Sequence, residues 1–309
     1  MAELWSLRGL SLRELARRTC RRSWEDEVFG HSARLAFYYF LGVFPALLLL
    51  LVLLNTFAGT GSELRNTLLD SVQQIVPREA AALIAKTTGE LNARAALGPG
   101  AIWAVLCAAW AILNGTWAMT VGLNKAYGIK EERPWWKILA IACGLTISLG
   151  IMSVIALAAM LYGSRAGTAI SRQLGLHALP VSWRILQWAA IVILLLFSFA
   201  SLYRFGPNLK DKRWQWSNPG AVTAIVLWIG FTLLLRISQD HSGSSQRIYA
   251  GLKPVATLLI WLYLTGAAIF IGGEVNSEIE KAAAEAGHSD VRRPQERRES
   301  GTASDAYAS

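Results

Sequence analysis

Residues 185–203 read ILQWAAIVILLLFSFASLY, a run of nineteen residues without a charged side chain. At 1.5 Å of rise per helical residue, about 20 residues cross the roughly 30 Å hydrocarbon layer of a bilayer. A segment in lipid must pair its own backbone polar groups, and a helix does so within the segment. The stretch therefore predicts a transmembrane helix.

Five more uncharged stretches of similar or greater length surround it. They are Leu35–Ser62, Ala95–Asn124, Ile138–Ser164, Trp214–Leu235 and Pro254–Gly273. The hydrophobic content of 53%, the charged content of 17% and the mean hydropathy of +0.36 exceed what the core of a soluble domain requires. The sequence predicts an all-α polytopic membrane protein with six transmembrane helices.

Lys and Arg divide unequally between the two sides that six spans define. The termini and the loops on their side carry 20 of these residues, and the alternate loops carry 10. Cytoplasmic segments of membrane proteins are enriched in Lys and Arg, so both termini are expected in the cytoplasm. The net charge of +9 comes from segments beside spans, which favours anionic lipid headgroups over nucleic acid as the partner.

Three regions follow from this pattern. Residues 1–34 form a basic cytoplasmic segment, in which Ser11 three residues before Glu14 is a capping-box pattern for an amphipathic helix beginning near Leu12. That helix either lies on the cytoplasmic leaflet or is an ordinary solvated helix that enforces topology. Residues 35–273 form the transmembrane domain. Residues 274–309 form a cytoplasmic tail, expected to be disordered after about residue 287.

The loop at 58–97 is too long for a plain connection. Apolar residues follow helical spacing on both sides of Pro77, which predicts an extracytoplasmic helical hairpin between the first two spans. The hairpin could cover a cavity, lie on the outer leaflet, or pack over the spans as inert cover.

Two spans contain features beyond apolar length. Pro45 removes a backbone donor near the middle of the first span, so a kink is expected, either structural or of the kind that exposes carbonyls in transporters. In the second span one stripe holds Trp103, Trp110, Asn114 and Trp117. The position of Asn114 among these rings predicts either an aromatic cavity that binds an amphiphile or a hydrogen bond from Asn114 to another helix.

A second stripe of the same span holds small residues and predicts a close helix contact. Its members are Ala104, Ala108, Ala111, Gly115, Ala118 and Gly122.

Signatures of catalysis and metal binding are missing from the sequence. The four His residues are scattered without metal-ligand spacing, and the three Cys residues offer no disulfide framework. No span carries a central ionisable residue, which disfavours an ion-driven pump. Glu274 is the best placed carboxylate, and by itself it is interpreted as a solvated charge at the membrane boundary. We expect no enzyme activity, no metal and no cofactor.

Four blocks in order resemble the YihY/BrkB family of bacterial inner-membrane proteins, once labelled ribonuclease BN. They are residues 33–45 (ARLAFYYFLGVFP), residues 122–127 (GLNKAY) with 132–134 (ERP), residues 202–208 (LYRFGPN) with Trp216 and 219–221 (PGA), and Tyr249, Gly251 and 261–263 (WLY) leading to 273–276 (GEVN). The resemblance implies a six-helix fold in the bacterial inner membrane and a role in envelope or lipid homeostasis. Ribonuclease activity is not expected, because RNA hydrolysis needs a positioned metal or an acid and base pair.

The leading hypothesis is a transporter or flippase-like protein for a lipid or other amphiphile, with membrane lipids as partners. A non-transporting membrane scaffold is the alternative, and the oligomeric state stays open. The candidate residues of the substrate path are Pro45, Asn114, Trp117, Asn124, Tyr127, Arg204, Gly206, Pro207, Asn208, Pro219, Gly220, Glu274 and Asn276. Among these, Arg204 is either a site for an anion or a positive-inside anchor, and Gly206-Pro207 predicts a rigid turn.

Overall fold

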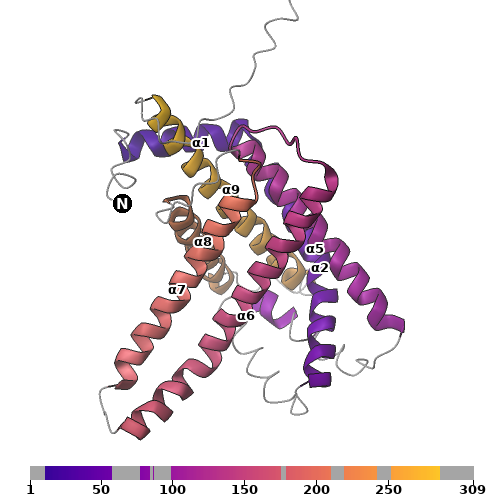
Figure 1. The fold of residues 1–309 in the computed structure, drawn as a ribbon, viewed down its shortest axis with the longest axis vertical. Coiled ribbons are helices and arrows are strands. Elements are labelled where there is room, and N and C mark those ends of the chain that lie inside the picture. The colour runs from indigo at the N-terminus through magenta and orange to yellow at the C-terminus, as the bar shows by residue number, and fades with distance from the viewer. Residues whose placement is uncertain are drawn as a thin grey trace, which may run out of the picture.

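The computed structural model describes residues 11–57, 77–83, 86, 99–174, 179–209, 219–241 and 252–285. Within these residues all regular secondary structure is helical, as predicted (Figure 1). The helices are α1 (Leu12–Glu25), α2 (Val28–Phe57), α5 (Pro99–Ala126), α6 (Trp135–Leu174), α7 (Leu179–Phe205), α8 (Pro219–His241) and α9 (Lys253–Glu285).

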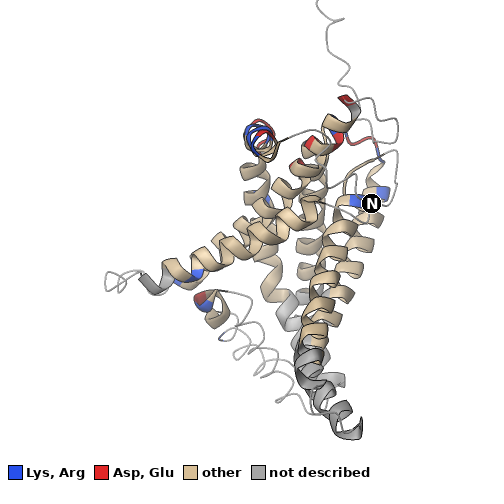
Figure 2. Ribbon diagram, turned by 90° about the vertical axis from the view of Figure 1, so that its left-hand side faces the viewer, with Lys and Arg blue, Asp and Glu red and all other residues tan. Residues whose placement is uncertain are grey.

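The described part of each of the six predicted spans lies in its own long helix. Among the described residues, five segments are long and apolar enough to cross a membrane: Leu106–Ala126, Trp135–Met152, Ile185–Phe205, Pro219–Ser238 and Lys253–Ala283. The first predicted span lies on α2, which is not among the five, so the six-span topology stays a prediction. Figure 2 shows most charged residues near the ends of the long helices.

Helix α1 begins where the capping pattern predicts. The Ser11 hydroxyl accepts a hydrogen bond from the Glu14 amide at 3.2 Å, which satisfies one of the free donors of the first turn. The helix lies across one end of the long helices (Figure 1). Leu15 is buried against Val275 and Ile279 of α9, so α1 packs on protein with part of its apolar face.

Helix α9 is longer than predicted. The sixth apolar stretch was expected to end at Gly273, but α9 continues to Glu285. The added turns are stabilised by packing, because Ile279, Ala282 and Ala283 are buried. The predicted disordered tail lies outside the described residues.

The long helices pack in pairs around α2 and α9. Helix α2 contacts α5 and α9, α8 lies against α9, and α6 pairs with α7. The predicted small-residue stripe is confirmed as a close contact, since a Cβ at Gly115 would lie 2.7 Å from the Tyr39 ring and one at Gly122 would overlap the Phe270 ring. The core beneath these contacts includes Leu123 and Tyr203.

The predicted hairpin at 58–97 lies largely outside the described residues. Within the described piece, residues 78–83 are helical after Pro77. Ala80 and Ala81 are buried against Leu258 of α9, with Phe40 of α2 beside them. Lys253 forms an ion pair with Glu79 at 2.9 Å. This piece therefore packs over the long helices, one of the alternatives that the sequence left open.

Candidate functional site

The turn after α7 is fixed by side chains from elsewhere in the chain. The Gly206 amide closes the last helical turn on the Leu202 carbonyl at 2.9 Å, and Pro207 is fully buried. The Asn208 amide donates to Oδ1 of Asn124, at the end of α5, at 2.7 Å. The predicted rigid turn is therefore anchored to α5, with Leu123 against Gly206 beneath it.

An ion pair completes this contact, which we call the α5–α7 junction (Asn124, Glu131, Arg133, Gly206 and Asn208). Arg133 Nε and Nη2 donate to the two Glu131 carboxylate oxygens at 2.7 and 2.6 Å, and Nη2 also donates to the Gly206 carbonyl at 3.1 Å. Nδ2 of Asn124 donates to the same carboxylate at 2.7 Å. Burial by itself raises the pKa of Glu131, but hydrogen bonds from Arg133 and Asn124 outweigh burial and hold the pKa below its ordinary value.

The junction makes two predicted roles more specific. The Gly206 carbonyl is not free for a ligand, because Arg133 occupies it. Arg204 is half-buried with its guanidinium carbon 5.4 Å from the centroid of the Phe205 ring, outside the junction. The anion site predicted for Arg204 stays a prediction. Sequence reasoning missed Glu131, whose only signal was an acidic residue two positions before an arginine.

The start of α8 is capped by a side chain of α9. The Gly220 amide, a donor in the first turn of α8, donates to Oδ1 of Asn276 at 2.8 Å inside the protein. A Cβ at Gly220 would overlap the Gly272 carbonyl, so the two helices touch backbone to backbone. The Tyr203 hydroxyl donates to the Ile269 carbonyl at 2.8 Å. Gly220 and Asn276 are thus brought together, as parts of a helix contact.

Glu274 contradicts the interpretation as a solvated boundary charge. Its relative exposure is 0%, because α9 continues past it and other helices cover it. Neither carboxyl oxygen has a hydrogen-bond partner among the described residues. The charged groups that act on it most are Asp26, Lys281, Glu278 and Arg22. A buried carboxyl without a partner is rare and points to a functional role.

The aromatic residues around Asn114 do not enclose the cavity that the sequence predicted. The exposed fractions of Trp103, Trp110 and Trp117 are 68%, 55% and 43%, so these rings face outward from α5. Asn114 donates to the Trp110 carbonyl of its own helix at 2.7 Å, whereas an interhelical bond was the expected alternative. An outward aromatic face is what a helix bordering lipid presents.

The remaining predicted residues occupy plain structural positions. Helix α2 continues through Pro45 to Phe57, so the proline does not end it. Tyr127 is buried just after α5, where Gly128 adopts a positive φ of 65°. Pro219 begins α8, a position at which proline costs no hydrogen bond.

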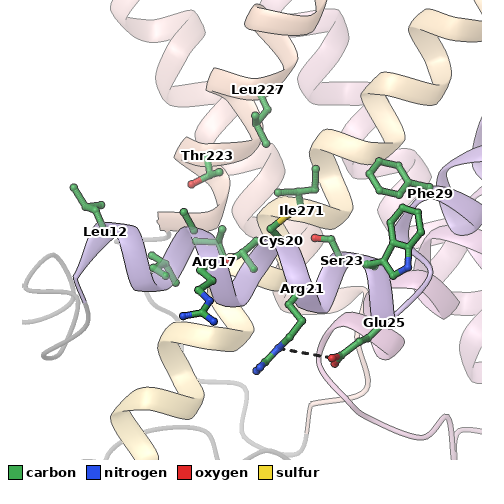
Figure 3. Close-up of a pocket in the computed structure, with 15 residues that line it drawn as sticks. Leu12, Arg17, Cys20, Arg21, Ser23, Glu25, Phe29, Thr223, Leu227 and Ile271 are labelled. Atoms are coloured by element: carbon green, nitrogen blue, oxygen red, sulfur yellow. Dashed lines mark ion pairs between the residues drawn. The ribbon is translucent and has the colours of Figure 1, made fainter.

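A groove that sequence reasoning missed lies between α1, the first turns of α8 and the middle of α9 (Figure 3). Its volume is about 980 Å³, and it is open to the outside of the protein. The lining is almost wholly apolar and includes Leu12, Leu227 and Ile271, with Cys20 projecting from α1. The lining comes from α1, α8 and α9, which are far apart in sequence, and from Phe29 at the start of α2, so no local pattern revealed it.

Two arginines of α1 lie beside the groove. Arg17 and Arg21 line the groove and extend from α1 on the side away from Leu227 (Figure 3). Arg21 lies 3.7 Å from Glu25, whereas none of the ion pairs in the described part of the chain uses Arg17. An apolar channel beside exposed guanidinium groups matches the chemistry of an anionic amphiphile.

Metal chemistry has no evident site in the described residues. No three His, Cys, Asp or Glu side chains in that part of the chain gather as metal ligands would.

Comparison with known proteins places the chain in a family. Over 252 residues it is 29% identical to the ribonuclease-like protein YfkH of Bacillus subtilis (strain 168). The aligned region covers 81% of this chain and 89% of that protein. No solved structure gives a significant match. A sequence model of the family described as "Virulence factor BrkB" matches residues 19–297. With nearly the whole chain matched, and with apolar helices long enough to cross a bilayer, this protein is a membrane protein that belongs to the BrkB family.

Proposed function

We propose that this protein binds a lipid in the bacterial inner membrane and moves it, as a transporter or flippase-like protein with both termini in the cytoplasm. The observation that carries the proposal is the open apolar groove beneath α1. Its volume of about 980 Å³ lies at the upper end of the roughly 300–1,000 Å³ that ligand pockets span. The proposed occupant is an acyl chain of an anionic phospholipid.

The position of α1 supports this choice of occupant. Amphipathic helices with Arg on the polar face rest at the headgroup level of a membrane, where their apolar face is covered by acyl chains. Leu12 and Trp24 of α1 expose 73% and 78% of their surface, so part of that face has no cover from the described protein. An acyl chain under α1 would cover it, and the lipid phosphate would meet the arginines.

The ends of the chain also support the orientation. The described start of the chain and the end of α9 meet at one end of the bundle, where Arg18 lies 3.6 Å from Glu285. Residues 12–25 and 274–285 thus lie on the same side. The excess of Lys and Arg in the segments on that side favours the cytoplasm as its location.

Transport can be separated from a scaffold role by filling the groove. Cys20→Trp places a large ring in the groove, and Cys107→Trp makes the same change on the exposed face of α5. In vesicles of phosphatidylethanolamine and phosphatidylglycerol, the movement of a fluorescent phosphatidylglycerol between leaflets should be fast with wild type and Cys107→Trp, and slow with Cys20→Trp. If the lipid moves no faster in vesicles with folded wild-type protein than in vesicles without protein, the result would favour the scaffold.

A further inference from the structure

Glu274 is the buried ionisable group that the groove and the helix contacts do not explain. Its side chain is fully covered, and both carboxyl oxygens lack a hydrogen-bond partner among the described residues. A carboxylate removed from water without a partner is strongly disfavoured, whereas a carboxylic acid tolerates the same place far better. The surroundings therefore suit the protonated side chain.

Charged groups of α9 itself and of the end of α1 act on Glu274 in opposite directions. Asp26 and Glu278 disfavour a negative charge there, whereas Lys281 and Arg22 favour one. Other titratable groups also face this region from the helices around it. They are His31 of α2, whose ring lies 6.1 Å from Phe270 of α9, Lys125 at the end of α5, and the buried Tyr203 of α7.

Arg22 connects this region to the groove. Its guanidinium lies 3.6 Å from Glu278 and 3.4 Å from Glu25, so it divides its charge between α9 and α1. Arg22 is on α1, the helix whose Cys20 lines the groove. A negative charge on Glu274 would compete with Glu278 for Arg22, and a change in this ion pair would change how α1 is held against α9.

We propose that Glu274 is a proton-binding site that sets the position of α1 over the groove. With the proton bound, α1 keeps the arrangement described above. When the carboxyl group releases its proton to water, the carboxylate draws Arg22 away from Glu278, and α1 shifts relative to α8. This regulation rests on the proposed function in one respect, which is that a lipid occupies the groove.

The test reads the position of α1 from its native cysteine. In the full chain with Cys107→Ser and Cys143→Ser, a bimane dye on Cys20 reports on the surroundings of the groove. In vesicles of phosphatidylethanolamine and phosphatidylglycerol, the dye emission should change with pH in a single one-proton transition. Glu274→Gln should abolish that transition, and Glu132→Gln, an exposed loop control, should leave it unchanged.

Variants of the neighbouring groups identify which group titrates. Asp26→Asn and Glu278→Gln should each keep a transition with a shifted midpoint, because both side chains act on Glu274. His31→Gln should keep the transition, which shows that His31 is not the titrating group. A wild-type protein without a transition, or a transition that survives Glu274→Gln, would overturn the proposal. If Glu274→Gln fails to insert, Glu274→Asp decides instead. It keeps a carboxyl group, so it must retain a transition with a shifted midpoint, and an unshifted midpoint would overturn the proposal.

The same vesicles separate this proposal from the function on which it rests. A phosphatidylglycerol with a photoreactive acyl chain should attach to α1 at the groove. Attachment without a pH transition overturns the proton site and leaves the lipid site standing. A pH transition that is lost in Glu274→Gln, without lipid attachment at the groove, supports the proton site. The same result rules out the groove as the lipid site.

Discussion

Arg133→Ala should destabilise the protein by about 2 to 3 kcal/mol through the α5–α7 junction. The arginine side chain makes three hydrogen bonds there, two to the Glu131 carboxylate and one to the Gly206 carbonyl. Removing one partner of a fully buried pair costs about 3–5 kcal/mol. The side chains of Arg133 and Glu131 are 12% and 22% exposed, so water recovers part of that cost.

Thermal unfolding of the purified protein in detergent micelles measures this loss. Lys130→Ala is the matched control, because it removes a positive charge from an exposed position of the same loop. The Arg133→Ala midpoint should fall by several degrees and the Lys130→Ala midpoint by about one degree or less. Equal midpoints for the two variants would refute the reasoning.

The pH dependence of the same measurement follows from Glu131. Its pKa is lower in the folded protein than its ordinary value of 4.5. A group with a lowered pKa stabilises the folded state above the ordinary pKa and loses that contribution as the pH falls through the lowered one. The difference between wild type and Arg133→Ala should therefore be full at neutral pH and shrink in acid, and a difference that grew in acid would contradict it.

Three further predictions address other parts of the chain. Gly220→Ala should lower the free energy of unfolding by about 1–3 kcal/mol, because its Cβ would overlap the Gly272 carbonyl. Gly230→Ala has open space around its Cβ and should lower it by less than about 0.5 kcal/mol in the same unfolding measurement. Arg204→Lys should insert normally but fail to complement a null strain at native expression level. The reason is that lysine cannot hold an anion with two parallel hydrogen bonds. Full complementation would mean that Arg204 is only an anchor. Cysteine reporters in the 58–97 loop should react from outside intact cells and terminal reporters should not, and the reversed pattern would overturn the orientation.

The elements of the fold were predictable because their signals are local. An uncharged run such as 185–203 needs no partner to be read as a membrane-spanning helix, and the Ser11 to Glu14 pattern marks the first helix by its own capping bond. The small-residue stripe of α5 was predictable for a similar reason, since close packing is the main use of glycine and alanine at that spacing.

The candidate site was less predictable because it depends on contacts between distant segments. Glu274 follows the last apolar residue of its stretch, and only the packing of α1 and α2 against α9 shows that it is buried. Asn114 stands among tryptophans in sequence, yet its stripe faces outward because the small-residue face of α5 takes the helix contact. The groove is lined by residues of α1, α2, α8 and α9, and no single segment encodes it.

The central claim, that a lipid chain occupies the groove beneath α1, is tested most directly by mapping where a lipid attaches. A phosphatidylglycerol with a photoreactive group in its acyl chain would be incorporated into vesicles with the full-length protein, activated by light, and located by mass spectrometry of peptides. We predict attachment concentrated on Leu12–Trp24 of α1 and on Thr223–Leu227 of α8, and its loss in Cys20→Trp. Attachment spread evenly over exposed residues such as Ile102, Trp103 and Trp110 of α5, with no enrichment at the groove, would contradict the claim.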